Sequence, residues 1–157
     1  MQPIMNTYGR LPVTFTHGKG AYLYDTEGKS YLDALSGIAV CGLGHAHPAV
    51  SEAIRSQAEN LIHTSNIYGI GRQQELAEKL TRLSGMDNVF FSNSGAEANE
   101  CAFKIARKYG HGKGIELPTI VVMEGAFHGR TLATLTATAN KAAQEGFGPL
   151  VQGVVRI

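Results

Sequence analysis

Residues 88–100 read NVFFSNSGAEANE and join a short apolar run to the start of a helix. The run over residues 88–91 predicts a strand. Ser94 suits the N-cap position of the helix, and Glu97, three residues later, is expected to complete a capping box. The helix is expected over residues 94–109, with one apolar stripe formed by Ala98, Cys101, Ala102, Ile105 and Tyr109.

The start of this predicted helix has the features of an anion site. The first N–H groups of a helix have no intrahelical acceptor and lie at the positive end of its dipole. Gly95 and Ala96 have little or no side chain to keep a phosphate away. Ser94, Gly95 and Ala96 are therefore candidate phosphate-binding residues. An ordinary capped helix after a strand is the alternative.

The residues that follow alternate between strand and helix patterns. PTIVVM, at 118–123, is a continuous apolar run, as expected of a parallel strand covered on both faces. Residues 131–139 indicate a Thr-rich helix, and GVVRI, at 153–157, indicates another strand. This alternation predicts an α/β fold with a mostly parallel sheet.

The first part of the chain follows a different pattern. Aromatic and aliphatic runs flank residues 25–29 and predict a β-hairpin in which Gly28 takes a positive φ. A helix is expected to open at Pro48, and a second is expected over residues 76–83, closed by Gly85. We place a domain boundary between residues 68 and 69.

The chain stops within the apolar run VQGVVRI, after a predicted sheet of two or three strands. Such a sheet is small for independent stability, and domains normally end on an exposed polar tail. We therefore expect the natural protein to continue beyond Ile157.

A second chemical motif, MEGAFHGRT, occupies residues 123–131 at the end of the strand PTIVVM. Ligands of open α/β sheets bind at this end of the strands. Phe127 offers a face that stacks on a flat ring, and Arg130 offers a planar fork suited to a carboxylate. His128 could donate or accept a hydrogen bond nearby. A glycine-rich turn with a core Phe and a solvated Arg is the alternative.

Composition narrows the function classes. Lys and Arg number 14 and Asp and Glu 13, so no basic excess favours binding to nucleic acid or to a membrane surface. No apolar stretch is long enough for a transmembrane helix. Cys41 and Cys101 indicate reduced cytosolic thiols. His45 and His47 supply two ligands of the four that a zinc site needs, so a turn and helix start are favoured there. No GxSxG context supports a serine hydrolase.

The chain resembles the N-terminal part of the class III aminotransferases, which depend on pyridoxal 5'-phosphate. The resemblance rests on GAYLYDTEGKSYLD, LSGIAV, GLGHAHP, FFSNSGAEANE and EGAFHGRT, in that order. It implies fold type I of the pyridoxal-phosphate transferases. Residues 1–68 would then be the N-terminal segment of the small domain, and residues 69–157 the start of a large, truncated α/β/α domain. Members are usually cytoplasmic homodimers with active sites at the subunit interface.

The resemblance also implies residue roles. Ser94, Gly95 and Ala96 would bind the cofactor phosphate, Phe127 would stack on the pyridine ring, and Arg130 would bind the α-carboxylate of the substrate. The family's Schiff-base lysine and its aspartate at the pyridine nitrogen lie in the later half of the chain. None of the seven lysines present has the family's context, so no catalytic residue is assigned.

The implied reaction transfers the terminal amino group of N2-acetylornithine to 2-oxoglutarate in arginine biosynthesis. The fragment alone is expected to be inactive. Sibling enzymes that use succinylornithine, ornithine or 4-aminobutyrate share much of the pattern and stay open as alternatives. A natural short chain that binds a phosphate ligand or a partner without catalysis is the alternative from another class.

Overall fold

The structure is a computed structural model that describes residues 3–157. The chain divides into two compact units, one ending at Ile70 and the other spanning Gly71–Ile157. The sequence-based boundary and the assignment of its two parts to a small and a large domain stay predictions.

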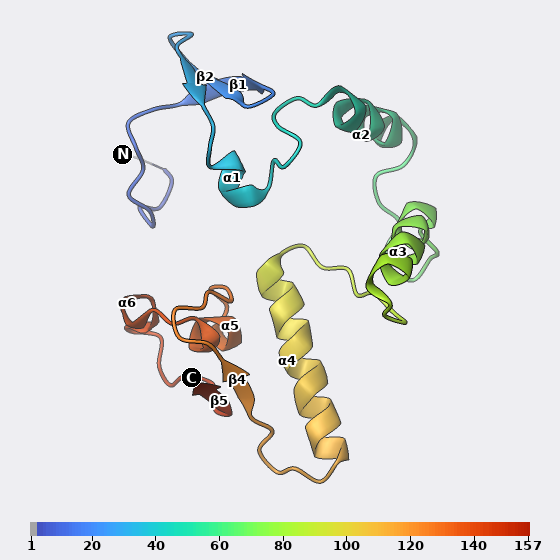
Figure 1. Ribbon diagram of the computed structural model, residues 1–157, viewed down its shortest axis with the longest axis vertical. Helices are drawn as coiled ribbons and strands as arrows, with labels where there is room; N and C mark the ends of the chain where they lie inside the picture. The colour runs from blue at the N-terminus through green and yellow to red at the C-terminus, as the bar shows by residue number, and fades with distance from the viewer. Residues whose placement is uncertain (1–2) are drawn as a thin grey trace. The chain divides into compact units, whose positions relative to one another are not determined.

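The first unit is built on a three-stranded antiparallel sheet in the order β1-β2-β3. These strands span Phe15–Lys19, Tyr22–Asp25 and Ser30–Leu32, and β1 and β2 are labelled in Figure 1. The predicted hairpin is confirmed, with Gly28 at φ +81° in its turn. The Asp25 carboxylate accepts from the Glu27 and Lys29 amides, both at 2.9 Å. It also accepts from the Tyr31 hydroxyl at 2.9 Å, which fixes the turn. Strand β1 was not predicted.

The element labelled α1, Ser36–Ala39, is a left-handed turn. Its four residues have φ of +54°, +64°, +61° and +60°, in chain order. L-residues adopt this conformation at a cost of roughly 1–2 kcal/mol each, and they rarely do so in succession. Asp33 and His45 lie at the base of the turn, where Asp33 Oδ2 is 2.7 Å from His45 Nε2.

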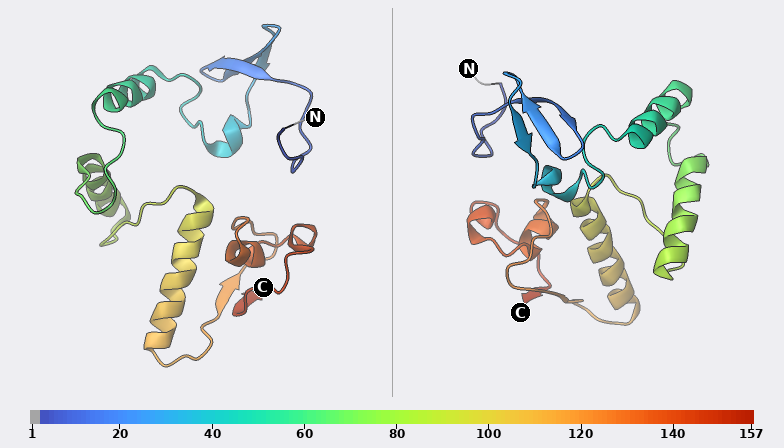
Figure 2. Two further views of the ribbon diagram at one scale, coloured as in Figure 1. Left: turned by 180° about the vertical axis from the view of Figure 1, so that it is seen from behind. Right: turned by 45° about the horizontal axis from the view of Figure 1, so that its top comes forward.

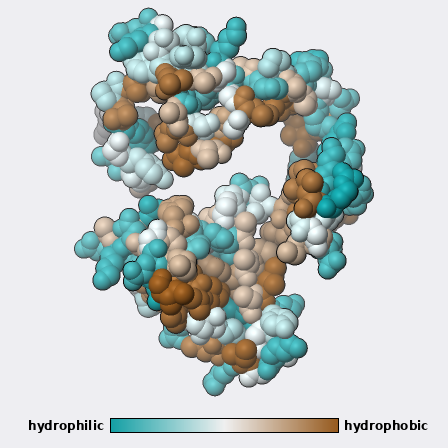
Figure 3. Space-filling model, in the orientation of Figure 1, coloured by the Kyte–Doolittle hydropathy of each residue, from teal (hydrophilic) through white to brown (hydrophobic). Residues whose placement is uncertain are grey.

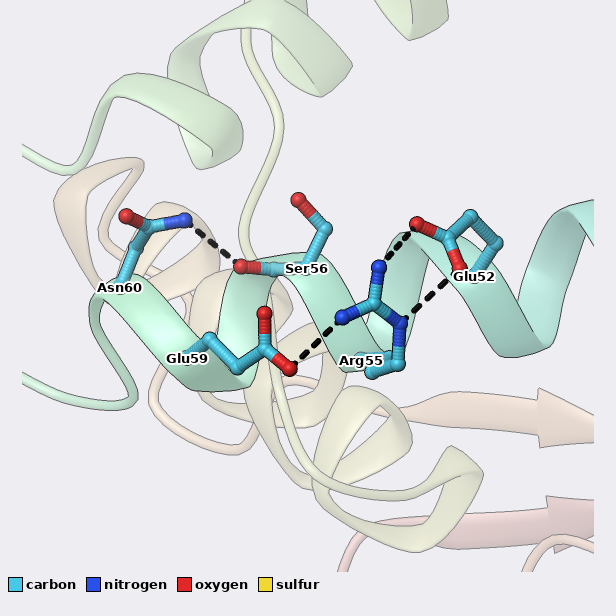
Figure 4. Close-up of polar contacts among 5 residues, drawn as sticks. All are labelled: Glu52, Arg55, Ser56, Glu59 and Asn60. Atoms are coloured by element: carbon cyan, nitrogen blue, oxygen red, sulfur yellow. Dashed lines mark hydrogen bonds and ion pairs between the residues drawn. The ribbon is translucent and has the colours of Figure 1, made fainter.

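Two exposed helices follow the expected pattern. Helix α2, Pro48–Asn60, begins with Pro48, and α3, Gly71–Ser84, is followed by Gly85 at φ +71°. Arg55 bridges Glu52 and Glu59 on α2 at 2.6 and 2.7 Å (Figure 4). Because these side chains are mostly exposed, such pairs contribute about 0–1 kcal/mol.

The second unit contains a parallel strand pair with a helical crossover. Strands β4, Ile120–Val122, and β5, Val154–Arg156, pair with Ile120 opposite Val154. The crossover between them contains α5, Leu132–Ala137, and α6, Lys141–Gln144. Helix α4, Gly95–Gly112, contacts α5 in this unit (Figures 1 and 2). The predicted α/β alternation is confirmed for these elements.

Two strand predictions need correction. Residues 88–91 do not form a strand, because within residues 3–157 they have no neighbouring strand to complete a hydrogen-bonded ladder. Strand β4 is not covered on both faces: Val122 is 5% exposed, whereas Val121 is 58% exposed. The most buried segment of the unit is instead the Thr-rich run Thr134–Thr138.

The apolar stripe predicted on α4 is mostly exposed in this unit. Ala98, Ala102, Ile105 and Tyr109 are exposed. The less exposed side carries Asn99, Phe103 and Gly110, and a Cβ on Gly110 would lie 2.6 Å from Pro118 Cγ. The less exposed side of α4 thus includes a glycine whose missing side chain leaves room for Pro118, and it does not coincide with the most apolar stripe.

Figure 3 shows exposed apolar surface, in brown, on many of the described elements. Among the described residues, no helix combines the length and apolarity needed to cross a membrane.

The two carboxylates of the first unit generate a pH prediction. A hydrogen bond from His45 lowers the pKa of Asp33, aided by the Ser36 amide. Burial raises the pKa of Asp25, but hydrogen bonds from Tyr31 and from the Lys29 and Glu27 amides outweigh it, so its pKa is also lowered. A carboxylate whose pKa is lower in the folded than in the unfolded protein contributes its full stabilisation of the fold at pH values above the unfolded-state pKa of about 3.9. That contribution is lost as the pH falls through the folded-state pKa.

We therefore expect the unfolding midpoint to decline as pH falls below about 4, and to decline less in the double variant Asp25→Asn, Asp33→Asn. Thermal unfolding of the complete protein followed by circular dichroism from neutral to acid pH measures both curves. Parallel curves for wild type and variant would contradict the assignment.

Candidate functional site

The site begins at the N-terminus of α4. Ser94 is the N-cap, with extended backbone, and its Oγ accepts from the Glu97 amide at 3.2 Å. The reciprocal half of the predicted capping box is displaced by one residue. The Glu97 carboxylate accepts from the amide of Asn93 at 2.7 Å and from its Nδ2 at 3.0 Å. The Gly95 and Ala96 amides, in the first turn, have no intrahelical acceptor.

Space is open beside this helix start. A Cβ built on Gly95 would meet no atom of the described residues within 4 Å. Ser94 Oγ accepts from the Glu97 amide as a cap, and its O–H can still donate, so the groups available to hold an anion are this hydroxyl and the backbone amides of the first turn. The Glu97 carboxylate is directed to Asn93 and accepts hydrogen bonds from its amide and its side chain.

The loop of residues 123–131 leaves the C-terminal end of β4, as predicted. Thr138, after α5, fixes its backbone: Thr138 Oγ1 accepts from the His128 amide at 2.9 Å and donates to the Gly129 carbonyl at 3.0 Å. The Ala139 amide donates to the Ala126 carbonyl at 2.8 Å. The loop therefore has a defined backbone.

This loop lies against the start of α4. Asn99 Nδ2 donates to the His128 carbonyl at 2.8 Å, and Thr131 Oγ1 bonds the Glu100 carboxylate. Gly129 has φ +135°, and a Cβ there would lie 2.8 Å from Ala96 Cβ and 2.6 Å from Thr134 Oγ1. These contacts bring the Ser94–Ala96 and Phe127–Arg130 segments together.

The side chains predicted to contact a ligand are accessible. Phe127 is 67% exposed, and the Arg130 guanidinium carbon lies 5.4 Å from the centroid of its ring. That distance is within the range of cation–π contacts, which orient an arginine on an aromatic face. His128 differs, because its Nε2 is buried and has no hydrogen-bond partner among residues 3–157.

Sequence reasoning missed the residues that hold this arrangement. Asn99, Gly129 and Thr138 make the contacts between α4, the loop and α5. A usable signal was the Thr-rich segment after Gly129, since Thr hydroxyls often bond nearby backbone groups. Asn99 had no such signal, because its partner is 29 residues away.

The remaining candidates lie elsewhere. His45 pairs with Asp33 in the first unit, and no group of three or more potential metal ligands occurs within the described part of the chain. Lys104 and Lys108 are exposed on α4.

The close contact at Gly129 predicts a large effect of a small substitution. Gly129→Ala should lower the free energy of unfolding by about 2–4 kcal/mol, because it combines an unfavourable φ with overlap against Ala96 and Thr134. Gly125→Ala is the matched control: that glycine also has positive φ, +73°, but an added Cβ would meet nothing within 4 Å. Denaturant unfolding of the complete protein measures both, and an equal loss in the two variants would refute a role for the contact.

The chain matches the family described as Aminotransferase class-III over residues 4–157. It is 61% identical to the acetylornithine aminotransferase of Nitrosomonas europaea over 157 residues, which is all of this chain and 40% of that protein. It is 53% identical to acetylornithine aminotransferase 1 of Bordetella parapertussis, covering 98% of this chain and 39% of that protein. The chain thus spans about 40% of the length of these curated relatives.

Solved structures agree with these matches. The crystal structure of the ornithine aminotransferase from Toxoplasma gondii matches with a TM-score of 0.94 and 32% identity, over 99% of this chain and 38% of that one. Another structure of that enzyme is described as having partial occupancy of PLP at its active site. An omega-transaminase from Thermomicrobium roseum matches with a TM-score of 0.87 and 35% identity, over 93% of this chain and 34% of that one. The expected type I fold is therefore confirmed, and the chain belongs to the class III aminotransferases.

Proposed function

We propose that the chain is the N-terminal part of an acetylornithine aminotransferase. The complete enzyme would act with pyridoxal 5'-phosphate and transfer the terminal amino group of N2-acetylornithine to 2-oxoglutarate. It would serve arginine biosynthesis as a cytoplasmic homodimer. The observation that carries this proposal is the 61% identity to an acetylornithine aminotransferase along the whole chain.

The residues at the start of α4 fit the phosphate of this cofactor. Open space adjoins Gly95, and the amides of Gly95 and Ala96 lack intrahelical acceptors. The positive end of the α4 dipole favours a dianion at this position. Ser94 would also bind the phosphate, because its Oγ accepts from the Glu97 amide and its O–H is left to donate. The exposed ring of Phe127, on a loop tied to the same helix, is suited to stacking on the cofactor's pyridine ring.

Arg130 would bind and orient a substrate carboxylate. Its guanidinium can bond a carboxylate through two parallel N–H groups, which fixes both distance and orientation. Contact with the Phe127 ring limits the positions the guanidinium takes. When bound, pyridoxal phosphate supplies the electron sink for amino-group transfer. The group that moves the proton is expected in the part of the complete enzyme outside this chain.

A second candidate is an ornithine aminotransferase. The TM-score of 0.94 to the Toxoplasma enzyme favours it, but the sequence identity there is 32%, against 61% to the acetylornithine enzyme. The two candidates would use the same cofactor and differ in the amine donor, so a comparison of donors separates them.

The complete enzyme should use N2-acetylornithine with kcat/KM at least about tenfold above the values for ornithine, succinylornithine and 4-aminobutyrate. Ornithine and 4-aminobutyrate lack the N2-amide, and a pocket that hydrogen-bonds this amide discriminates strongly against them. Succinylornithine carries the amide, but its acyl group is larger and charged, so a pocket that fits an acetyl group disfavours it. Initial rates of glutamate formation from 2-oxoglutarate, measured with each donor, decide this. A higher value for ornithine would select the second candidate, and no transfer with any donor would refute the aminotransferase proposal.

The variant Arg130→Ala provides the control for substrate orientation. It should raise KM for N2-acetylornithine by about 10- to 100-fold, the range expected for loss of a charge-assisted hydrogen-bond pair. The absorbance of the bound cofactor should be retained, because the proposed phosphate contacts come from α4. An unchanged KM would remove Arg130 from the substrate site.

A further inference from the structure

The left-handed turn at residues 36–39 is costly and is not explained by burial of its side chains. Ile38 is β-branched and sits at φ +61°, a conformation that such residues avoid strongly. Ile38 and Val40 are 80% and 79% exposed. The strain is therefore not offset by packing of these side chains within the described unit. Strained backbone persists where surrounding contacts enforce it, and such strain is frequent at functional sites.

Asp33 provides the contacts that enforce the turn. Its Oδ1 accepts from the Leu35 amide at 3.0 Å and from the Ser36 amide at 2.8 Å, at the entrance to the turn. Its Oδ2 lies 2.7 Å from His45 Nε2, and the side chains are 7% and 20% exposed for Asp33 and His45. Hydrogen bonds to an ionised, partly buried carboxylate are among the stronger ones in proteins.

His45 is itself held in place by the sheet. Its amide donates to the Gly20 carbonyl at 2.8 Å, and its carbonyl accepts from the Gly20 amide at 3.0 Å. A Cβ on Gly18 would lie 2.6 Å from His45 Cβ, so the His45 side chain lies directly against the backbone of β1. The chain of contacts therefore runs from the sheet through His45 and Asp33 to the turn.

The exit of the turn is closed by its own hydrogen bonds. The Ser36 carbonyl accepts from the amides of Val40 and Cys41, both at 2.9 Å. The Ser36 hydroxyl donates to the Cys41 carbonyl at 2.8 Å. The exchange of these two amides consequently reports whether the left-handed turn is formed.

We propose that Asp33 and His45 are positioning residues that hold residues 36–39 in the left-handed conformation, and that the complete enzyme needs this conformation for its reaction. The second half of the proposal rests on the function proposed above. The first half rests on the geometry of the turn alone.

The test uses the complete enzyme with Asp33→Ala, together with Asp25→Ala as a matched control. Asp25 also accepts two backbone amides and one side-chain donor, but its contacts lie in the β2–β3 turn. Hydrogen exchange by mass spectrometry, on peptides covering residues 36–41, should be faster by about tenfold in Asp33→Ala and unchanged in Asp25→Ala. His45→Leu should show a smaller increase and serves if Asp33→Ala fails to fold.

A glycine substitution separates positioning from general damage. Ala39 has φ +60°, so Ala39→Gly removes part of the strain without touching the Asp33–His45 pair. When Ala39→Gly is added to Asp33→Ala or to His45→Leu, exchange of residues 36–41 should be about fivefold slower than in the corresponding single variant. If the reaction needs the turn, kcat/KM should fall about tenfold in Asp33→Ala. It should rise again when Ala39→Gly is added, in parallel with the exchange protection, while the cofactor content stays constant.

Unchanged exchange in Asp33→Ala and His45→Leu would overturn the first half of the proposal. Faster exchange with unchanged kcat/KM, or with no rescue of kcat/KM by Ala39→Gly, would overturn the second half. A wild-type enzyme that transfers no amino group would instead refute the proposed function and, with it, the second half. The exchange comparison would then still decide the role of Asp33 and His45.

Discussion

The candidate site depends on the contact between Gly129 and the first turn of α4. A side chain at Gly129 would overlap with Ala96 and Thr134, so the loop reaches the helix only because this residue has none. Asn99 and Thr138 then fix the loop by hydrogen bonds to its backbone at 2.8–3.0 Å. The result is that a helix start with unpaired amides, an exposed aromatic ring and an arginine belong to one compact unit. Each of these features is common alone, and it is their presence together in one unit that marks this region as a candidate site.

Much of this arrangement was predictable because the signals are local. Ser94 as a cap, Gly28 and Gly85 at positive φ, and Pro48 at a helix start follow from the preferences of single residues. The parallel pairing of residues 120–122 with 154–156 followed from two apolar runs separated by a helical pattern. The resemblance to the class III aminotransferases, which the comparisons confirmed, supplied the family and the candidate roles that these local signals do not carry.

The parts that could not be predicted depend on partners distant in the sequence. Residues 88–91 have strand character but no neighbouring strand among the described residues, so pattern alone gave the wrong assignment. The packed side of α4 is set by Gly110 against Pro118 and by Asn99, which a count of apolar residues cannot reveal. The left-handed turn was equally hidden, because it is enforced by Asp33 and by His45, twelve residues further on.

The central claim, that the first turn of α4 binds the cofactor phosphate, is tested most directly by a crystal structure of the complete enzyme with pyridoxal phosphate. The account predicts that the phosphate accepts hydrogen bonds from the Gly95 and Ala96 amides at about 2.7–3.2 Å, with the Phe127 ring stacked on the pyridine. A phosphate bound away from this helix start, or a pyridine ring that does not contact Phe127, would contradict it.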